Sequence, residues 1–227
     1  MKVFKVLLLT FSLLAVSQAK AGFITINESA LDGIFSQASF ANTPIDIRID
    51  TVTELVFPDL LRITSTSEVY QLFRQHIGPF DLVNFYFIDF ISSCGFANNN
   101  NYVGCGELPG NDFVVESSYA AGRFGTELLA HELGHNLGLP HLIGGTTGLM
   151  SPSLNNNTTL NTTEVNTIRN SPLIQTDGAE YWINIKPVLI VAVASTPLPV
   201  PEPSTLLLLL LAIGFLVKKS RQTSRMI

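Results

Sequence analysis

The chain has 227 residues, of which 14% are charged and 46% are hydrophobic, and its formal net charge is −5. Positions 22–199 hold six basic and 17 acidic side chains, so this region would repel a phosphate backbone. That balance excludes nucleic acid as a partner. Without its two terminal segments the chain keeps about 180 residues, which is enough for one domain.

The first segment has the features of a secretory signal. Two lysines precede an apolar run, Val6–Val16, and Ala19-Lys20-Ala21 offers an A-x-A cleavage site. The apolar run is too short to span a bilayer as a helix. We therefore expect a signal peptide over residues 1–21, removed to leave a mature chain that starts near Gly22.

Three elements are expected in the next fifty residues. Residues 27–40 begin with a cap residue and carry apolar side chains at helical spacing, which predicts a helix. Residues 45–49 alternate apolar and charged side chains, as a half-buried strand does. Residues 67–76 predict a second helix, with Ser67 as its N-cap. His76 would end that helix, where a cation suits the helix dipole, and we interpret it as structural.

Three strands are predicted between residues 82 and 116. Residues 82–91 are rich in β-branched and aromatic side chains, which indicates a buried strand. Residues 103–107 and 112–116 have the same character over shorter lengths. The turn residues at 109–111 separate these two and favour a reversal of the chain.

The chain contains two cysteines, Cys94 and Cys105. An even number of cysteines in an exported chain predicts a disulfide, because the compartments outside the cytosol are oxidising. Closing so short a loop would stabilise the fold by roughly 2–3 kcal/mol.

The most informative stretch is 131–141, His-Glu-Leu-Gly-His-Asn-Leu-Gly-Leu-Pro-His, which fits the pattern H-E-x-x-H-x-x-G-x-x-H. It contains three of the four histidines of the chain. On a helix, His131 and His135 are one turn apart and share a face. Gly138 can adopt a positive φ, which ends the helix and lets His141 return to the same point.

Three histidine ligands predict a catalytic zinc site, with one Zn²⁺ per chain, because they leave the fourth position open for water. Glu132 would take a proton from the zinc-bound water and pass it to the leaving amine. Two alternatives stay open at this point. The histidines could be core residues bonded to backbone carbonyls, or the site could bind zinc without catalysis.

The stretch resembles the metzincin clan of metallopeptidases. The segment Gly148–Pro152, with Met150 at its centre, looks like the methionine turn that this clan carries beneath its metal. Some metzincins have a tyrosine ligand just after that methionine. Ser151 and Pro152 stand there in this chain, so no tyrosine ligand is inferred.

The resemblance implies an α+β fold over residues 22–194, with a mixed twisted sheet, an active-site helix and a small C-terminal subdomain. It also implies that residues 103–107 form an edge strand that binds the substrate backbone by β-addition. Gly104 and Gly106 would let a peptide approach this strand closely, or they mark a bulge. Residues 141–152 would line the specificity pocket.

Four further segments complete the domain. Residues 155–163 are rich in asparagine and threonine and predict a loop, and residues 164–169 a short helix. Residues 181–193 predict a closing strand. Residues 195–199 form a linker that contains proline.

The tail, residues 200–227, starts with Pro201-Glu202-Pro203, continues with an apolar segment at 206–217 and ends with a basic cluster. The apolar segment is short for a membrane span unless its flanks contribute, and the basic cluster would stop it on the cytoplasmic side. This order resembles the PEP-CTERM sorting signal of Gram-negative bacteria. An ordinary membrane anchor is the alternative.

The sorting resemblance implies an exosortase-type processing enzyme as a partner and a transient membrane insertion of the tail. Tail removal would release the protein to the cell exterior or to the cell-surface matrix, where exopolysaccharide is a further partner.

Three functions follow from these features. The first is a secreted zinc-dependent endopeptidase that acts on protein or peptide substrates, with Glu132 as general base. The second is a catalytically silent zinc-binding protein of the extracellular matrix. The third is a zinc hydrolase for a non-peptide amide, because the metal chemistry does not select the acyl group.

Overall fold

The computed structural model describes residues 26–95, 97–98, 102–143 and 147–194. The expected signal peptide at 1–21, the linker at 195–199 and the sorting tail at 200–227 lie outside these residues. No helix within the described part is long and apolar enough to cross a membrane. The chain divides after Ala192 into two units, and the first contains all the elements below.

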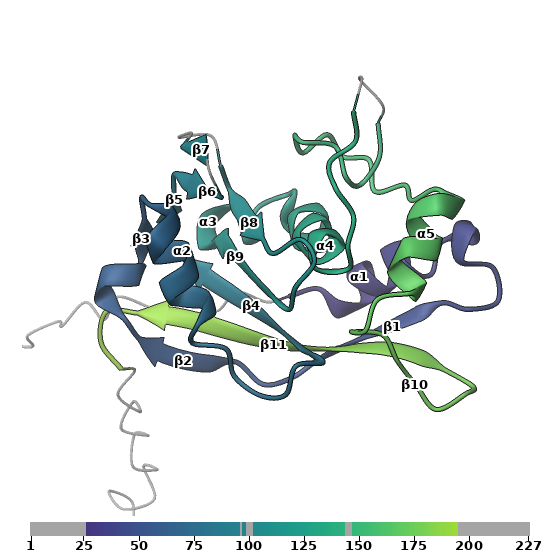
Figure 1. Ribbon diagram of the computed structural model, residues 1–227, viewed down its shortest axis with the longest axis horizontal. Coiled ribbons are helices and arrows are strands. Elements are labelled where there is room, and N and C mark those ends of the chain that lie inside the picture. The colour runs from purple at the N-terminus through teal and green to yellow at the C-terminus, as the bar shows by residue number, and fades with distance from the viewer. Residues whose placement is uncertain (1–25, 96, 99–101, 144–146, 195–227) are drawn as a thin grey trace, which may run out of the picture. The chain divides into compact units, whose positions relative to one another are not determined.

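The centre of the fold is a seven-stranded mixed sheet (Figure 1). Only the short strands β8 and β10 run antiparallel to their neighbours. The path across the sheet is β1 (Ile45–Ile49), β11 (Tyr181–Val191), β4 (Leu82–Ile88), β9 (Asp112–Glu116) and β8 (Gly104–Gly106), with β2 (Thr53–Val56) and β10 (Gln175–Thr176) also paired to β11.

Helices and two small strand pairs surround this sheet, which confirms the expected α+β class with a mixed sheet. The helices are α1 (Glu28–Phe35), α2 (Thr66–Phe73), α3 (Ser117–Ala120), α4 (Gly125–Asn136) and α5 (Thr162–Arg169), with the 3-10 turns η1 (Ala38–Phe40) and η2 (Pro58–Leu60). The small pairs are β3 (Arg62–Ile63) with β5 (Phe90–Ile91), and β6 (Ser93–Cys94) with β7 (Ala97–Asn98).

Both faces of the sheet are buried, and β4 shows how. Phe85 and Phe87 point into a core that α1, α4 and α5 share, whereas Tyr86 and Ile88 point into a second core with α2. A strand buried on both faces has a continuous apolar sequence, which is why β4 lacks alternation. The strand predicted over 82–91 ends at Ile88, and Phe90–Ile91 form the separate strand β5. The site helix α4 and the helix α2 therefore lie on opposite faces of the sheet.

The predicted closing strand, β11, lies in the interior of the sheet between β1 and β4 and ends at Val191. Pro187 of β11 lies where the neighbouring strand changes from β1 to β2. Asp50 N–H donates to Ile185 O, and Phe57 N–H donates to Val191 O, so odd-numbered residues face the β1–β2 side. Pro187 lies between these two pairings, where no strand requires the N–H that proline lacks.

Helix boundaries differ from the sequence expectations at several points. The prediction of Ser67 as N-cap is wrong, because Ser65 caps α2 in a reciprocal capping box with Glu68. The helix expected over 27–40 stops at Phe35, after which η1 follows. The loop expected at 155–163 is shorter, because α5 starts at Thr162 and is itself capped by Asn161.

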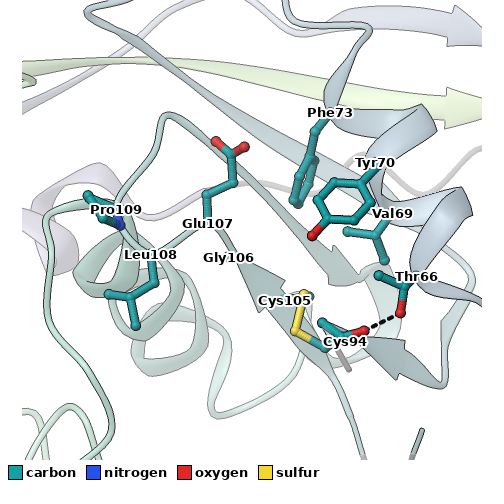
Figure 2. Close-up of a pocket in the computed structure, with 11 residues that line it drawn as sticks. Thr66, Val69, Tyr70, Phe73, Cys94, Cys105, Gly106, Glu107, Leu108 and Pro109 are labelled. Carbon is teal, nitrogen blue, oxygen red and sulfur yellow. Dashed lines mark hydrogen bonds between the residues drawn. A yellow bond between two sulfur atoms is a disulfide. The ribbon is translucent and has the colours of Figure 1, made fainter. Parts of the chain in front are cut away.

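The predicted disulfide is confirmed. It joins Cys94 of β6 to Cys105 of β8, with 5.6 Å between the two Cα atoms (Figure 2). The bond joins β6 to the α2-facing side of β8, and it fixes the position of that strand relative to β6.

Replacing both cysteines, Cys94→Ser with Cys105→Ser, should lower the free energy of unfolding by about 3 kcal/mol, because the unfolded chain regains the entropy of an open loop. Urea unfolding followed by circular dichroism measures this. Reductant should destabilise the parent by a similar amount and leave the double variant unchanged. Equal stability of parent and double variant would contradict the prediction.

Candidate metal centre

Helix α4 positions the first two histidines of the motif. It is buried on almost all sides, and His131 and His135 are only 6% and 8% exposed. The helix ends after Asn136, and Gly138 adopts a φ of 95°, as the sequence predicts. This left-handed turn reverses the chain and brings His141 back beside the helix.

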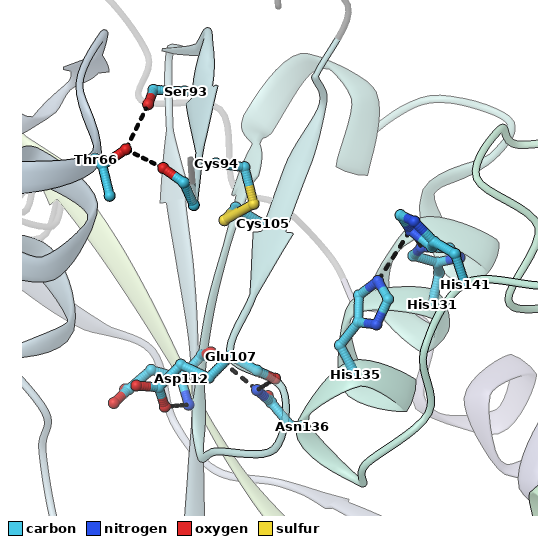
Figure 3. The surroundings of a disulfide bond; sticks show 11 residues. Thr66, Ser93, Cys94, Cys105, Glu107, Asp112, His131, His135, Asn136 and His141 are labelled. Carbon is cyan, nitrogen blue, oxygen red and sulfur yellow. Dashed lines mark hydrogen bonds between the residues drawn. A yellow bond between two sulfur atoms is a disulfide. The ribbon is translucent and has the colours of Figure 1, made fainter. Parts of the chain in front are cut away.

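The three imidazoles converge on one point (Figure 3). His141 Nε2 lies 3.1 Å from both His131 Nε2 and His135 Nε2. Tetrahedral zinc with Zn–N bonds of about 2.0–2.1 Å separates its ligand nitrogens by roughly 3.3–3.4 Å. The two separations of 3.1 Å are close to this value, and all three ligand nitrogens lie within 4.8 Å of one another, so the cluster suits a zinc ion.

Backbone carbonyls fix the protonation of two of these rings. His131 Nδ1 lies 2.7 Å from Leu149 O, and His135 Nδ1 lies 2.7 Å from Leu139 O. A carbonyl only accepts, so each Nδ1 carries the proton and each Nε2 presents a lone pair. His141 Nε2 lies close to the Nε2 atoms of both other rings, but it has only one proton to donate to them. A bound cation would satisfy all three, so the donor chemistry also fits.

Burial keeps these rings in the form that binds metal. It lowers the pKa of His131 to about 4 and that of His135 to about 4, although the bonds to the carbonyls act in the opposite direction. Burial also lowers the pKa of His141. Metal ligation needs the neutral imidazole, so these rings can bind a cation at neutral pH without first losing protons.

Metal binding should stabilise the fold. At a free zinc concentration 100-fold above the dissociation constant, the gain is about 2.7 kcal/mol. Differential scanning fluorimetry should show a lower Tm after dialysis against a chelator and recovery when zinc is added back. His135→Ala should lose the response, whereas Gln71→Ala on the exposed face of α2 should keep it. A response that survives His135→Ala would contradict this site.

Glu132 lies against the edge strand β8. Gly106 N–H donates a hydrogen bond to its carboxylate. A Cβ atom at Gly104 would lie 2.8 Å from Glu132 Cδ, and one at Gly106 would lie 3.2 Å from Glu132 Oε2. The register of β8 with β9 is continuous through both glycines, so they mark no bulge. Their role in the structure is to leave room for Glu132.

Burial raises the pKa of Glu132 to about 8, and the hydrogen bond from Gly106 N–H opposes that rise. Without a nearby cation this carboxyl is therefore poised near neutral pH. A dication bound by the histidines would favour the charged form and lower the pKa.

Gly104→Ala should destabilise the protein only while Glu132 is present. The added methyl group would overlap the carboxylate, which is too enclosed to move freely. A double-mutant cycle with Glu132→Ala, measured by urea unfolding, should give a coupling of roughly 0.5–3 kcal/mol.

Gly33→Ala is the matched control for this cycle. Gly33 lies within α1, and nothing lies within 4 Å of a Cβ atom placed there. It should show no coupling to Glu132→Ala. Additive effects of Gly104→Ala and Glu132→Ala would refute the contact.

Met150 is fully buried beside the histidine cluster. A Cβ atom at Gly134 would lie 2.5 Å from Met150 Sδ, so the first glycine of the motif makes room for this side chain. The neighbouring Leu149 O is the acceptor for His131. The methionine turn inferred from resemblance stays a prediction, and this packing agrees with it. The specificity pocket expected over 141–152 falls partly on residues 144–146, outside the described part.

Glu127 is a site residue that sequence reasoning missed. It is only 5% exposed, and its carboxylate accepts N–H bonds from Asn155 (2.8 Å) and Asn156 (2.9 Å). These bonds attach the loop after Met150 to the helix that carries the histidines. One signal was present in the sequence, because Glu127 precedes His131 by one helical turn.

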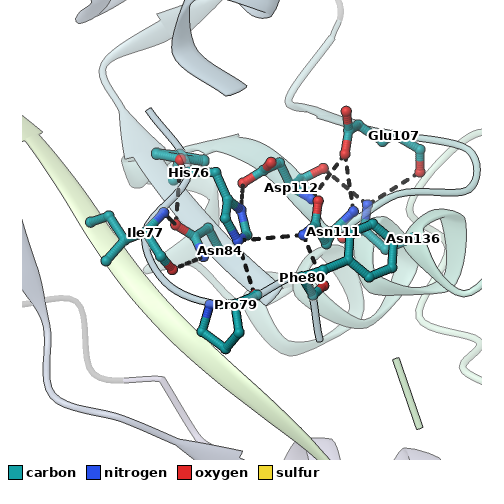
Figure 4. A network of polar contacts seen from close by, with 10 residues as sticks. His76, Ile77, Pro79, Phe80, Asn84, Glu107, Asn111, Asp112 and Asn136 are labelled. Carbon is teal, nitrogen blue, oxygen red and sulfur yellow. Dashed lines mark hydrogen bonds and ion pairs between the residues drawn. The ribbon is translucent and has the colours of Figure 1, made fainter. Parts of the chain in front are cut away.

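Asn136 ties the end of α4 to the turn between β8 and β9 (Figure 4). Its Nδ2 donates to Glu107 O (3.2 Å) and to Asp112 O (2.9 Å). His76 also belongs to this network, with its Nδ1 3.0 Å from Asp112 Oδ1. The dipole interpretation of His76 is therefore wrong, because α2 ends at Phe73 and the ring bonds to the sheet instead.

The mixed sheet, the buried histidine helix and the returning third histidine are consistent with a metzincin-like metallopeptidase domain. Residues 59–142 match the family described as Metallo-peptidase family M12B Reprolysin-like. Residues 199–222 match the PEP-CTERM protein-sorting motif. No protein of curated function matches the chain significantly. The resemblance inferred from the motif and from the tail is thus confirmed.

Proposed function

We propose that this protein is an exported zinc endopeptidase in which His131, His135 and His141 hold the metal and Glu132 is the general base. The observation that carries the proposal is the convergence of three Nε2 atoms beside an enclosed carboxylate. The reprolysin-like match over 59–142 supports peptide bonds as the substrate class.

Zinc, when bound, would polarise the scissile carbonyl and acidify a water molecule. Glu132 would accept the proton of the attacking water and then deliver it to the leaving amine. In the free protein Gly106 N–H holds this carboxylate against β8, so proton transfer would first require its release from that bond.

Strand β8 would hold the substrate. Glu107 N–H donates to Asp112 O and Glu116 N–H donates to Val103 O, so residues 103 and 107 face β9. In an antiparallel ladder the backbone groups of Gly104 and Gly106 then face the free edge. An extended peptide could pair with them, and its pairing with Gly106 would release Glu132.

The sorting motif indicates export in a Gram-negative bacterium, to the cell surface or beyond. We infer that an exosortase-type enzyme recognises Pro201-Glu202-Pro203 and removes the tail. The peptidase would then act outside the cell or within the surface matrix.

The test is hydrolysis of a denatured protein by the purified zinc-loaded protein. Glu132→Gln should lower kcat by about 10²–10⁴-fold, the usual contribution of a general base, while bound zinc stays at one ion per chain. Chelation should abolish hydrolysis, and zinc should restore it.

Glu180→Gln is the matched control, because that carboxylate is exposed and the residue directly precedes β11. It should hydrolyse as the parent does. Hydrolysis that survives Glu132→Gln would refute the mechanism. Zinc binding without any hydrolysis by the parent would favour the silent matrix protein.

A further inference from the structure

A pocket of about 300 Å³ lies between α2 and the β8–β9 turn, and we call it the α2 pocket (Figure 2). Val69 and Phe73 of α2 form its buried floor, at 3% and 8% exposure. Tyr70 and Leu108 stand at its rim, 53% and 52% exposed. Its size is at the lower end of the range for ligand pockets and suits one large side chain.

The α2 pocket and the histidine cluster lie on opposite faces of β8. Cys105 points into the core that contains α2, whereas Cβ atoms at Gly104 and Gly106 would point at Glu132 on α4. Figure 3 shows the same separation, with Thr66 of α2 on one side of the disulfide and the histidines on the other. Gly106 lines the pocket, and it also lies against Glu132.

This arrangement matters for a peptide bound along the edge of β8. Side chains of an extended peptide alternate between the two faces of the sheet to which it adds. One set would face the histidine cluster. The other set would face α2, where the pocket is the hollow beside the strand.

The residues that line the α2 pocket determine which kind of side chain it can bind. Of the described residues that line it, Glu107 alone carries a charge. Its Oε2 accepts N–H bonds from Asn111 (3.0 Å) and Asp112 (3.2 Å), which fix the carboxylate in place. Figure 2 shows this carboxylate between the Leu108–Pro109 segment and the rings of Tyr70 and Phe73.

We propose that the α2 pocket binds a lysine or arginine side chain of the substrate, at a position whose side chain points away from the histidine cluster. The aliphatic stem would lie on Val69 and Phe73, and the cationic end would meet Glu107 beside the Tyr70 ring. The acidic balance of the domain agrees with a basic substrate. This inference rests on the proposed peptidase function.

The experiment compares quenched peptides that are identical except for one residue, arginine or its neutral isostere citrulline, placed in turn at each position of the sequence. At one position the parent should cleave the arginine peptide with a kcat/KM about tenfold higher, the ratio expected for one charge-assisted hydrogen bond of about 1.4 kcal/mol. Glu107→Gln keeps an acceptor oxygen for the turn and should bring this ratio close to one. Equal cleavage of both peptides at every position would overturn the pocket and leave the peptidase function standing.

Two further variants test whether the charge in the pocket causes the preference for arginine. Leu108→Lys places a cation at the exposed rim and keeps the bonds of the Glu107 carboxylate to Asn111 and Asp112, and it should reverse the preference even if Glu107→Gln fails to fold. Asp59→Asn removes the same charge in η2, outside the pocket, and should leave the ratio unchanged. A loss of preference in Asp59→Asn as large as that in Glu107→Gln would overturn the proposal, because overall acidity would then explain it.

A binding measurement separates this inference from the peptidase function. Fluorescence anisotropy with Glu132→Ala protein reports the affinity of uncleaved arginine and citrulline peptides. A preference for arginine that Glu107→Gln removes would support the pocket even if the parent cleaves no peptide. Equal affinities would overturn the pocket whether or not the parent is a peptidase.

Discussion

The close approach of three imidazole nitrogens is the constraint on which the rest of the site depends. Two of the rings receive their orientation from carbonyl acceptors, Leu149 O and Leu139 O, so their lone pairs face each other. His141 Nε2 lies 3.1 Å from both of their Nε2 atoms, and a single proton there would have to be shared between two acceptors. The surrounding core holds the three rings in this arrangement.

That core is built around α4. Its close packing depends on glycines, which lack side chains, as much as on the apolar side chains. Gly134 admits Met150 on one side of the helix, and Gly104 and Gly106 admit Glu132 on another. A methyl group at Gly134 or Gly104 would overlap its neighbour, so close packing fixes the helix relative to β8 and to the segment that carries Leu149. The carboxylate of Glu127 adds a polar attachment on the same helix.

The sequence was most informative where the determinants are local. Ligand spacing, the turn at Gly138 and the disulfide partners are encoded within short stretches, and the structure agrees with each. The capping box of Ser65 and Glu68 was equally local, and a stricter application of the S-x-x-E pattern would have placed the start of α2 correctly.

Long-range features were not predictable in the same way. Nothing in residues 181–193 indicates that β11 inserts between β1 and β4, because strand order depends on the packing of both cores. The contact of Glu132 with β8 joins residues far apart in the chain, and the glycines of β8 suggested a substrate approach or a bulge instead. The hydrogen-bond partners of Asn136 could not be predicted from the sequence for the same reason, since these bonds join α4 to the β8–β9 turn.

Strand β8 shows how three residues can serve two faces of a sheet. Gly104 and Gly106 face α4 and lack side chains, which brings the general base of the proposed mechanism directly against the backbone. Cys105 faces α2, and its disulfide to Cys94 holds the strand from the other side. A peptide paired with this edge would touch both environments at once, the histidine cluster with one side chain and the α2 pocket with the next. Selection of the substrate and positioning of its scissile bond would then depend on the same short strand, and movement of β8 would disturb both.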